Sequence, residues 1–336
     1  MALCALMATA TLTSCEGALD DIFGEWSRPV KPLSIEETPL TIEAVESGTI
    51  TISYKGGLTL PKPITYTKNG VSTSITADTD IAVAAGDIVS FSSENSTLND
   101  DGSGYLNILA DHKIYAYGNV MSLINDEGDF SKDKTISGEY ALAGLLLGNT
   151  ELYNHPEKKI ILPATTLSEG CYEQMFYGCN KMATAPELPA KEMKDKCYYG
   201  MFTYCRSFTT APALPSTSLA TKCYYEMFHS CSSLTTAPAL PATTLKKECY
   251  YEMFKNCDVL TETPHLAAET LADDCYIYMF QNCPALTKAY VKVGFDTNCQ
   301  GMFAGCTDVS TSTFYTDGSG WNSANGVTNW QKEAYQ

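Results

Sequence analysis

The pattern of apolar and polar positions divides the chain into two parts. From about Pro39 to Asn125, apolar and polar residues alternate in short runs such as LTIEAV, TITISY and DIAVAAGDIVSF. This period of two, in runs rich in Thr, Ile, Val and Tyr that end at Gly, Asn or Asp, predicts about six to eight short β-strands. The segment TKNGVS predicts a two-residue hairpin turn at Asn69 and Gly70. A small all-β sandwich is the simplest fold for this part.

The second part repeats a segment of 26 residues, marked by nonamers such as CYYEMFHSC at 223–231. Twelve of the fourteen cysteines fall into two columns. The first column holds Cys171, Cys197, Cys223, Cys249, Cys275 and Cys299, and the second holds Cys179, Cys205, Cys231, Cys257, Cys283 and Cys306. A repeat of this size cannot bury its apolar side alone, so the copies are expected to stack as a solenoid.

The nonamer carries apolar residues at helical spacing. At about 100° per residue, the cysteines, Tyr224, Met227 and Phe228 form one apolar stripe, which predicts a helix in each repeat. The following segment LTTAPALPA contains two prolines, so only a few residues around Thr235 to Ala237 are expected to pair as a strand. The pattern therefore predicts an α/β leucine-rich-repeat solenoid, with a short parallel strand plus a helix in each 26-residue repeat.

The cysteine columns are interpreted as a structural ladder of small buried side chains. On a helix, the two cysteines of one nonamer would lie roughly 12 Å apart between Cα atoms, whereas a disulfide needs less than about 7 Å. Equivalent cysteines of stacked helices would lie about 8 to 10 Å apart. Zinc sites favour closer sequence spacing, so no metal is expected. Oxidative pairing of some thiols and metal binding stay as alternatives.

Departures from the repeat mark its ends. Residues 141–152 keep the apolar stripe but place Ala141 and Asn149 at the cysteine positions, which predicts an N-terminal cap within about 135–165. Residues from about 307 to 336 break the period, and Trp321 and Trp330 are expected to cover the open end. The predicted organisation is a sandwich domain over 36–130 and a solenoid over 131–336.

The first residues resemble a bacterial export signal. Residues 1–15 are apolar and end in Leu-Thr-Ser-Cys, which resembles the sequence at which lipoproteins are cleaved and acylated on cysteine, here Cys15. An ordinary signal peptide, in which Cys15 has no role, is the alternative. Residues 16–35 are expected to be a linker whose acidic start resembles a surface-export signal. These two features together predict an outer-membrane lipoprotein exposed on the cell surface. No apolar stretch is long enough to span a bilayer as a helix.

Charge and motif content argue against several classes of function. The chain has 39 acidic and 22 basic residues and a formal net charge of -17, so nucleic acid and anionic membranes are poor partners. Contact with a membrane is expected only through the lipid anchor. His112, His155, His229 and His265 are scattered without a catalytic motif, so neither an enzyme nor a cofactor is expected. We expect a monomer.

The repeats resemble a known family. LPATTL, CYYEMFxxC and LTTAPALPATTL, together with AYGNVMSLI at 116–124 and the segment 138–167, are similar to BspA-like leucine-rich-repeat surface lipoproteins of gut Bacteroidota. The resemblance implies a solenoid behind a β-sandwich in an adhesin or interaction module. It implies no functional residue, because the shared motif is a core motif.

Two binding functions follow as expectations. The first is a cell-surface binding or adhesion protein that mediates protein–protein or host-matrix interaction. The alternative is a glycan-binding lipoprotein of a polysaccharide-uptake system, which would need exposed aromatic side chains. Tyr199, Tyr225 and Tyr251 form a column on the exposed side of the predicted helices and are the candidate binding surface, although a repeated tyrosine can also serve packing.

Overall fold

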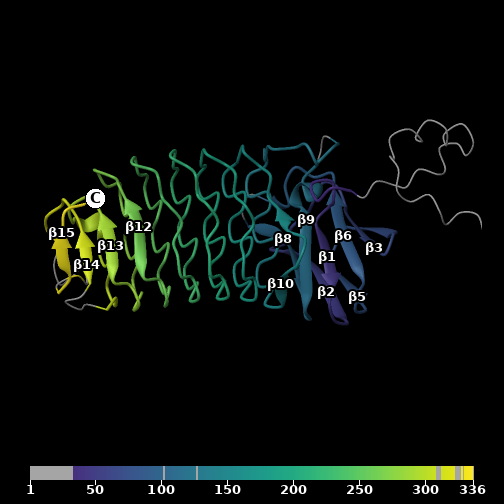
Figure 1. The fold of residues 1–336 in the computed structure, drawn as a ribbon. Coiled ribbons are helices and arrows are strands. Elements are labelled where there is room, and N and C mark those ends of the chain that lie inside the picture. The colour runs from purple at the N-terminus through teal and green to yellow at the C-terminus, as the bar shows by residue number, and fades with distance from the viewer. Residues whose placement is uncertain are drawn as a thin grey trace, which may run out of the picture. The chain divides into compact units, whose positions relative to one another are not determined.

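The computed structural model describes residues 33–100, 103–125, 128–307, 312–321, 327 and 329–335. Residues Ile35–Gln336 belong to one compact unit (Figure 1). This structure is nearly all β, with 26% of residues in strands and 2% in helices. Its described helical segments are two 3-10 turns, η2 (Val120–Leu123) and η3 (Thr297–Cys299). Among the described residues, no helix has the length and apolar character needed to cross a bilayer.

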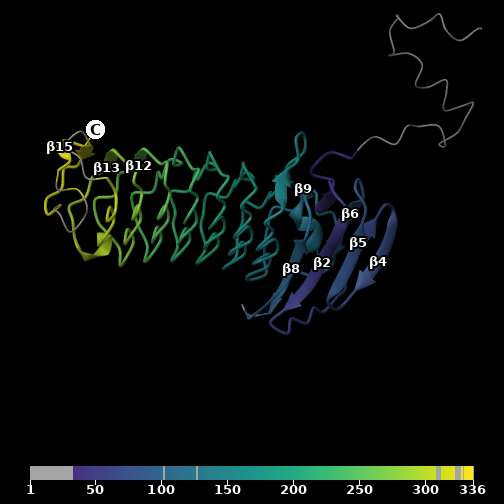
Figure 2. The ribbon, with the colours of Figure 1, turned by 90° about the horizontal axis from the view of Figure 1, so that it is seen from below.

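The alternating N-terminal segment forms two sheets that share one hydrophobic core (Figure 2). One sheet has the order β5-β2-β8-β7, and the other has the order β10-β9-β1-β6-β3-β4, with β11 beside β9. The strand bounds are β1 (Thr41–Ala44), β2 (Gly48–Lys55), β3 (Ile64–Lys68), β4 (Val71–Ile75), β5 (Thr79–Val83), β6 (Ile88–Ser93), β7 (Asn99–Asp100), β8 (Gly104–Ala110), β9 (Ile114–Asn119), β10 (Leu152–Asn154) and β11 (Ile160–Ile161). The predicted hairpin is confirmed: β3 pairs with β4, and Asn69 and Gly70 take positive φ values of 47° and 84°.

The sheets continue into the repeats through backbone pairing. Strand β9 pairs in parallel with both β10 and β11. On β8, the Ile108 amide donates to the Leu145 carbonyl at 2.8 Å. Asn149, which stands at a cysteine position, donates from Nδ2 to the Ile108 carbonyl at 2.6 Å and accepts from the Ala110 amide at 2.9 Å. Segment 140–149 is therefore an additional coil that joins the sheets to the first repeat.

The predicted helices are absent from the described repeats, so the α/β leucine-rich-repeat solenoid is a wrong prediction. Each nonamer lies in a series of linked β-turns, which we call the turn ribbon. The turn ribbons of the full repeats span 170–179, 196–205, 222–231, 248–257 and 274–283. Within the first, the amides of Met175, Tyr177 and Cys179 donate to the carbonyls three residues earlier. The alternate amides of Tyr172, Gln174 and Phe176 donate to Cys197, Tyr199 and Met201 of the next coil at 3.0, 2.8 and 3.0 Å.

Backbone dihedrals explain why the ribbon is not a helix. Gly170, Gln174 and Gly178 have φ values of 59°, 52° and 75°, and the equivalent residues of the later ribbons are also positive. An α-helix needs negative φ at every residue. The apolar residues come in adjacent pairs that begin every four residues. This spacing is compatible with one face of a helix and equally with a series of four-residue turns. The turns form here because half of the amides bond to the neighbouring coil.

The segments that follow the ribbons are mostly extended without forming long strands. Thr184, Thr210 and Thr236 make isolated parallel bridges from coil to coil, so the strand expected around Thr235 to Ala237 is reduced to one bridging residue. Among the described repeats, a parallel sheet forms at the C-terminal end, in the order β12-β13-β14-β15, with a register shift between Glu262 and His265. These strands are β12 (Glu262–Leu266), β13 (Lys288–Val291), β14 (Thr313–Tyr315) and β15 (Gln331–Glu333).

Aromatic ladders fill the solenoid core. One ladder stacks the phenylalanines of successive ribbons, with ring centroids 5.4–5.8 Å apart, through Phe176, Phe202, Phe228, Phe254, Phe280 and Phe303. A parallel ladder stacks Tyr172, Tyr198, Tyr224, Tyr250 and Tyr276. At the C-terminal end, Trp321 and Trp330 both lie 5.9 Å from Phe303 between ring centroids, and both are buried. The expectation that the two tryptophans cover the open end is confirmed.

The twelve ladder cysteines are unpaired, and all are buried except Cys306, which is partly buried. Each thiol of the second column, from Cys179 onward, donates to a carbonyl of the preceding coil, as Cys231 Sγ does to Phe202 at 3.2 Å. The distances inferred from helices do not apply to this fold. Coils that share backbone hydrogen bonds lie about 4.8 Å apart, so Cα separations alone do not exclude disulfides between coils. Parallel Cβ atoms at that spacing are still about 1 Å farther apart than a disulfide prefers.

Candidate binding surface

The turn ribbons present one side to the core and one to the outside. The two residues that follow the buried Tyr and the two that follow the buried Phe of each ribbon form what we call the turn face; most of them are partly exposed, while others such as Thr203 and Ser230 are buried. In the ribbon 222–231 these residues are Tyr225, Glu226, His229 and Ser230. In the ribbon 248–257 they are Tyr251, Glu252, Lys255 and Asn256. Stacking therefore brings residues 26 positions apart into direct contact on this face.

Tyr199, Tyr225 and Tyr251 stack on the turn face. Their ring centroids lie 4.6 Å apart in both pairs, with interplanar angles of 5° and 4°. Tyr278 meets Tyr251 edge-on at 6.2 Å, so its ring covers part of the remaining face of the stack. All three stacked tyrosines are half-buried. The column therefore offers hydroxyl groups and ring edges to a partner, while both ring faces of the central Tyr225 are used in contacts within the protein.

The hydroxyls of this column are neutral in ordinary conditions. Burial, followed by the negative charge of Glu226, raises the pKa of Tyr199 to about 12. Burial is also the main cause of the raised pKa values of Tyr225 and Tyr251, and neighbouring carboxylates add to it. Each hydroxyl can therefore both donate and accept a hydrogen bond at neutral pH.

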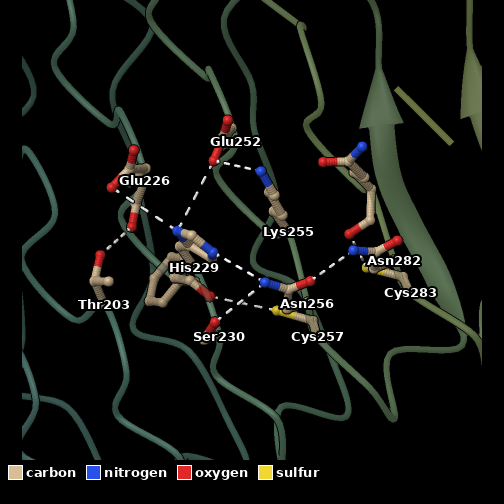
Figure 3. Close-up of polar contacts among 12 residues, drawn as sticks. Thr203, Glu226, His229, Ser230, Glu252, Lys255, Asn256, Cys257, Asn282 and Cys283 are labelled. Atoms are coloured by element: carbon tan, nitrogen blue, oxygen red, sulfur yellow. Dashed lines mark hydrogen bonds and ion pairs between the residues drawn. The ribbon is translucent and has the colours of Figure 1, made fainter. Parts of the chain in front are cut away.

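Figure 3 shows a cluster of polar side chains around His229, and its members Glu226 and Glu252 each directly follow a tyrosine of the column in the sequence. His229 Nδ1 lies 3.8 Å from Glu226 Oε2 and 3.9 Å from Glu252 Oε2. The Glu252 carboxylate also pairs with Lys255 Nζ at 3.0 Å. The side chains of His229 and Glu252 are only 14% and 13% exposed, and that of Glu226 is 26% exposed.

The other ring nitrogen of His229 is held by a series of amides. Asn256 Nδ2 lies 3.0 Å from His229 Nε2 and 3.3 Å from Ser230 Oγ. Asn282 Nδ2 in turn donates to Asn256 Oδ1 at 3.0 Å (Figure 3). As drawn, Nε2 accepts and Nδ1 carries the ring proton toward the carboxylates. The imidazole orientation is thus fixed by residues of the two following coils.

This cluster was not predicted from the sequence. In the sequence, His229 is one of four scattered histidines, and no repeated histidine or metal motif accompanies it. The available signal was a Glu-x-x-His spacing at Glu226 and His229 together with a glutamate 26 residues after the first, at Glu252. Of the predicted site residues, the three tyrosines are brought together on the turn face. The cysteine columns lie in the core, and Cys15 lies outside the described residues.

A second aromatic group lies on the C-terminal sheet. His265 and Tyr290 stack with ring centroids 4.1 Å apart, and Tyr290 and Tyr315 stack at 4.7 Å. His265 is exposed and borders a groove of about 430 Å³ that Leu240 and Pro241 also line. This group is a separate candidate surface, because it lies on the strand side of the coils.

A groove of about 420 Å³ lies where the sheets meet the repeats, lined in part by Asn154, His155 and Lys159. His155 Nδ1 accepts the amides of Glu157 and Lys158, both at 3.0 Å. Its ring also contacts Tyr115 and Tyr117 edge-on. These contacts give His155 a structural role in shaping the loop.

Comparison of the chain with known protein families, with curated proteins and with solved structures finds no match.

Proposed function

We propose that this protein is a cell-surface-anchored binding or adhesion protein and that the turn face binds a protein partner, such as a host-matrix protein. The supporting observation is the contrast between the two sides of the turn ribbons. The inward positions of the five full ribbons repeat Cys, Tyr, Met, Phe and Cys, whereas the outward positions vary more: the column that holds tyrosine in three ribbons has Glu173 and Ile277 in the other two. Packing accounts for the constant positions, so the variable ones are available for recognition.

The chemistry of the turn face suits a protein partner. The charges of Glu226 and Glu252 act on Tyr199, and Lys222 Nζ lies 5.4 Å from the ring centroid of Tyr225, so the surface combines amphipathic aromatic groups with charges of both signs. Tyrosine is enriched among the residues that contribute most to protein–protein affinity. The glycan alternative draws less support from this column, because sugar rings pack on aromatic faces and the faces of Tyr225 are covered on both sides.

The binding test uses variants that keep the stack intact. Purified protein is assayed against a panel of matrix proteins and against a glycan array. Replacing Tyr199, Tyr225 and Tyr251 with phenylalanine should weaken binding to the protein partner at least tenfold, about 1.4 kcal/mol, because only hydroxyl contacts are removed. The matched control replaces Tyr290 and Tyr315 with phenylalanine on the strand side and should leave binding unchanged.

The outcomes separate the two functions. If only the control variant loses binding to the protein partner, the strand side is the contact surface and the proposal for the turn face is wrong. If the protein binds glycans alone, and His265→Ala abolishes that binding, the glycan-binding function replaces the proposed one.

Anchoring at Cys15 is the second part of the proposal, supported by the Leu-Thr-Ser-Cys sequence that precedes acylation in lipoproteins. Mass spectrometry of the native protein should show an N-terminal cysteine that carries acyl chains, and Cys15→Ala should release the protein from the membrane fraction. Several acyl chains together make such an anchor stable. Recovery of a native protein that still begins at Met1 would disprove the anchor.

A further inference from the structure

We propose that Glu226, His229 and Glu252 form a binding site for a divalent cation of the zinc class. One atom from each side chain can be chosen so that the three lie within 4.8 Å of one another. His229 Nδ1 is buried and has no hydrogen-bond partner among the described residues. Imidazole nitrogen and carboxylate oxygen are ligands that Zn²⁺ accepts.

The geometry needs only a small contraction to hold the ion. Zinc binds nitrogen and oxygen at about 2.0–2.2 Å, so neighbouring ligands of a tetrahedral ion lie roughly 3.3–3.5 Å apart. The His229 Nδ1 distances to the two carboxylates are 3.8 and 3.9 Å. Contraction by about 0.5 Å brings each carboxylate to this spacing from Nδ1, and the two carboxylate oxygens, which lie within 4.8 Å of each other, must also approach by rotation of the glutamate side chains.

The residues around His229 can support a metal-bound imidazole. A bound ion requires a free lone pair on Nδ1 and places the ring proton on Nε2. Rotation of the Asn256 amide would place Oδ1 where Nδ2 now lies, 3.0 Å from Nε2. Oδ1 can then accept a hydrogen bond from the Nε2 proton. Asn282 can turn in the same way to preserve its contact with Asn256. Such an orienting partner is usual for histidines that bind metal.

Lys255 is the group that the ion would displace. Its Nζ lies 3.0 Å from Glu252 Oε2 and so occupies the position of a cation. Lys255 Nζ also lies 5.4 Å from the ring centroid of Tyr278. Rotation of the lysine side chain can therefore move the ammonium from Glu252 onto this ring. Once Lys255 has moved away, the two carboxylates carry two negative charges and the neutral imidazole carries none. A divalent cation balances this charge.

The site has a consequence for recognition. Three protein ligands leave at least one coordination position of a tetrahedral ion open. The cluster is partly exposed on the turn face, so this position would be available to water or to an oxygen atom of a partner. The proposal does not rest on the proposed binding function, because the metal alone is its probe.

The experiment measures Zn²⁺ binding to tag-free, reduced protein by isothermal titration calorimetry. One ion per chain is expected. Glu252→Gln and His229→Gln should each weaken binding at least tenfold, whereas Lys255→Met should strengthen it because the competing ammonium is removed. His265→Ala, which removes an exposed histidine elsewhere, serves as the matched control and should change nothing.

Cobalt distinguishes this site from the cysteine columns. Co²⁺ bound by imidazole and carboxylate lacks the sulfur-to-cobalt charge-transfer band that thiolate ligands produce. Melting temperatures of the variants establish that each is folded. Absence of stoichiometric binding, binding that folded Glu252→Gln and His229→Gln variants retain, or a thiolate band would each overturn the proposal and leave the cluster as an ion-pair network.

Discussion

At the residue scale, the tyrosine column is both a packing feature and a surface. Each pair stacks at 4.6 Å, and the three rings are half-buried, so replacement with serine removes packing as well as hydroxyl groups. Loss of binding in a serine variant would therefore not identify a contact surface. The phenylalanine variants make that distinction because they leave the stack in place.

The stack itself can be tested at Tyr225, which contacts a ring on both sides. Tyr225→Ser should lower the free energy of unfolding by about 1–3 kcal/mol, since an aromatic pair contributes about 0.5–1.5 kcal/mol beyond its buried area. Tyr225→Phe should stay within about 0.5 kcal/mol of the parent. Urea unfolding measures both. A serine variant as stable as the parent would show that the rings are not packed.

The thiols of the two cysteine columns are chemically protected. Burial raises the pKa of Cys171 and of Cys223 to about 12, and the other ten ladder thiols are raised for the same main reason. A protonated, buried thiol is a poor nucleophile. The second column also donates hydrogen bonds that oxidation would remove.

Alkylation should therefore label few ladder cysteines in the native protein. In denaturant without reductant, most of the twelve should react, because they are reduced in the fold. Mass spectrometry after alkylation gives both counts. Coils at about 4.8 Å spacing come close to the geometry of a disulfide, so labelling of very few cysteines in denaturant would show that the coils approach and pair.

At the element scale, the sequence predicted which residues face the core but not the conformation that places them there. The period of 26, the alternating strands and the covering tryptophans follow from apolar spacing and were predictable. The turn ribbon was not, because pairs such as Cys223-Tyr224 and Met227-Phe228, spaced by four, fit a helix equally well. Positive φ at Glu226 and Glu252 has no sequence signal, since glutamate favours helices.

Asp274 gives a direct test of ribbon against helix. Its φ is 55°, where an ordinary side chain costs about 1–2 kcal/mol and glycine costs nothing. Asp274→Gly should therefore be more stable than Asp274→Ala by about 1 kcal/mol. In a helix the order would be reversed, because glycine is about 1 kcal/mol less favourable than alanine there. Thermal unfolding of the two variants decides the sign.

At the scale of the whole molecule, the cluster of Glu226, His229 and Glu252 does not follow from its residues taken singly. Its ligands lie on two coils, and their proximity depends on the stacking register that pairs residue 226 with residue 251 through the backbone. The helix prediction placed neighbouring coils about 8–10 Å apart, too far for Glu226 and Glu252 to share one histidine. The closer spacing of hydrogen-bonded coils creates the cluster.

The buried thiols also make the whole fold sensitive to alkali. A thiol with a pKa of about 8.5 in the unfolded chain and a raised pKa in the fold stabilises the protein below pH 8.5, and this stabilisation is lost as the pH rises toward the folded value. In that pH window, the contribution of each such thiol to the free energy of unfolding falls by about 1.4 kcal/mol per pH unit. Over about one pH unit, the summed loss from twelve thiols is as large as the whole free energy of unfolding of a typical domain, roughly 5–15 kcal/mol.

We therefore expect cooperative unfolding to begin between about pH 9 and 10 in the presence of reductant. Circular dichroism as a function of pH measures the midpoint, and a return to neutral pH tests reversibility. Replacing Cys223 and Cys249 with alanine should move the midpoint upward, provided that the variant is folded at neutral pH. A parent protein that is unchanged at pH 11 would contradict this account.

The described coils exchange backbone hydrogen bonds with their two neighbours, and this locality bears on how such a chain can change over generations. Similar copies of 26 residues allow unequal recombination, which adds or removes whole coils. The sheets before the first coil and the tryptophans after the last would be left untouched by such an event. The reach of the solenoid could therefore lengthen or shorten in steps of about 4.8 Å, while the residues displayed on the turn face are reshuffled with each exchange.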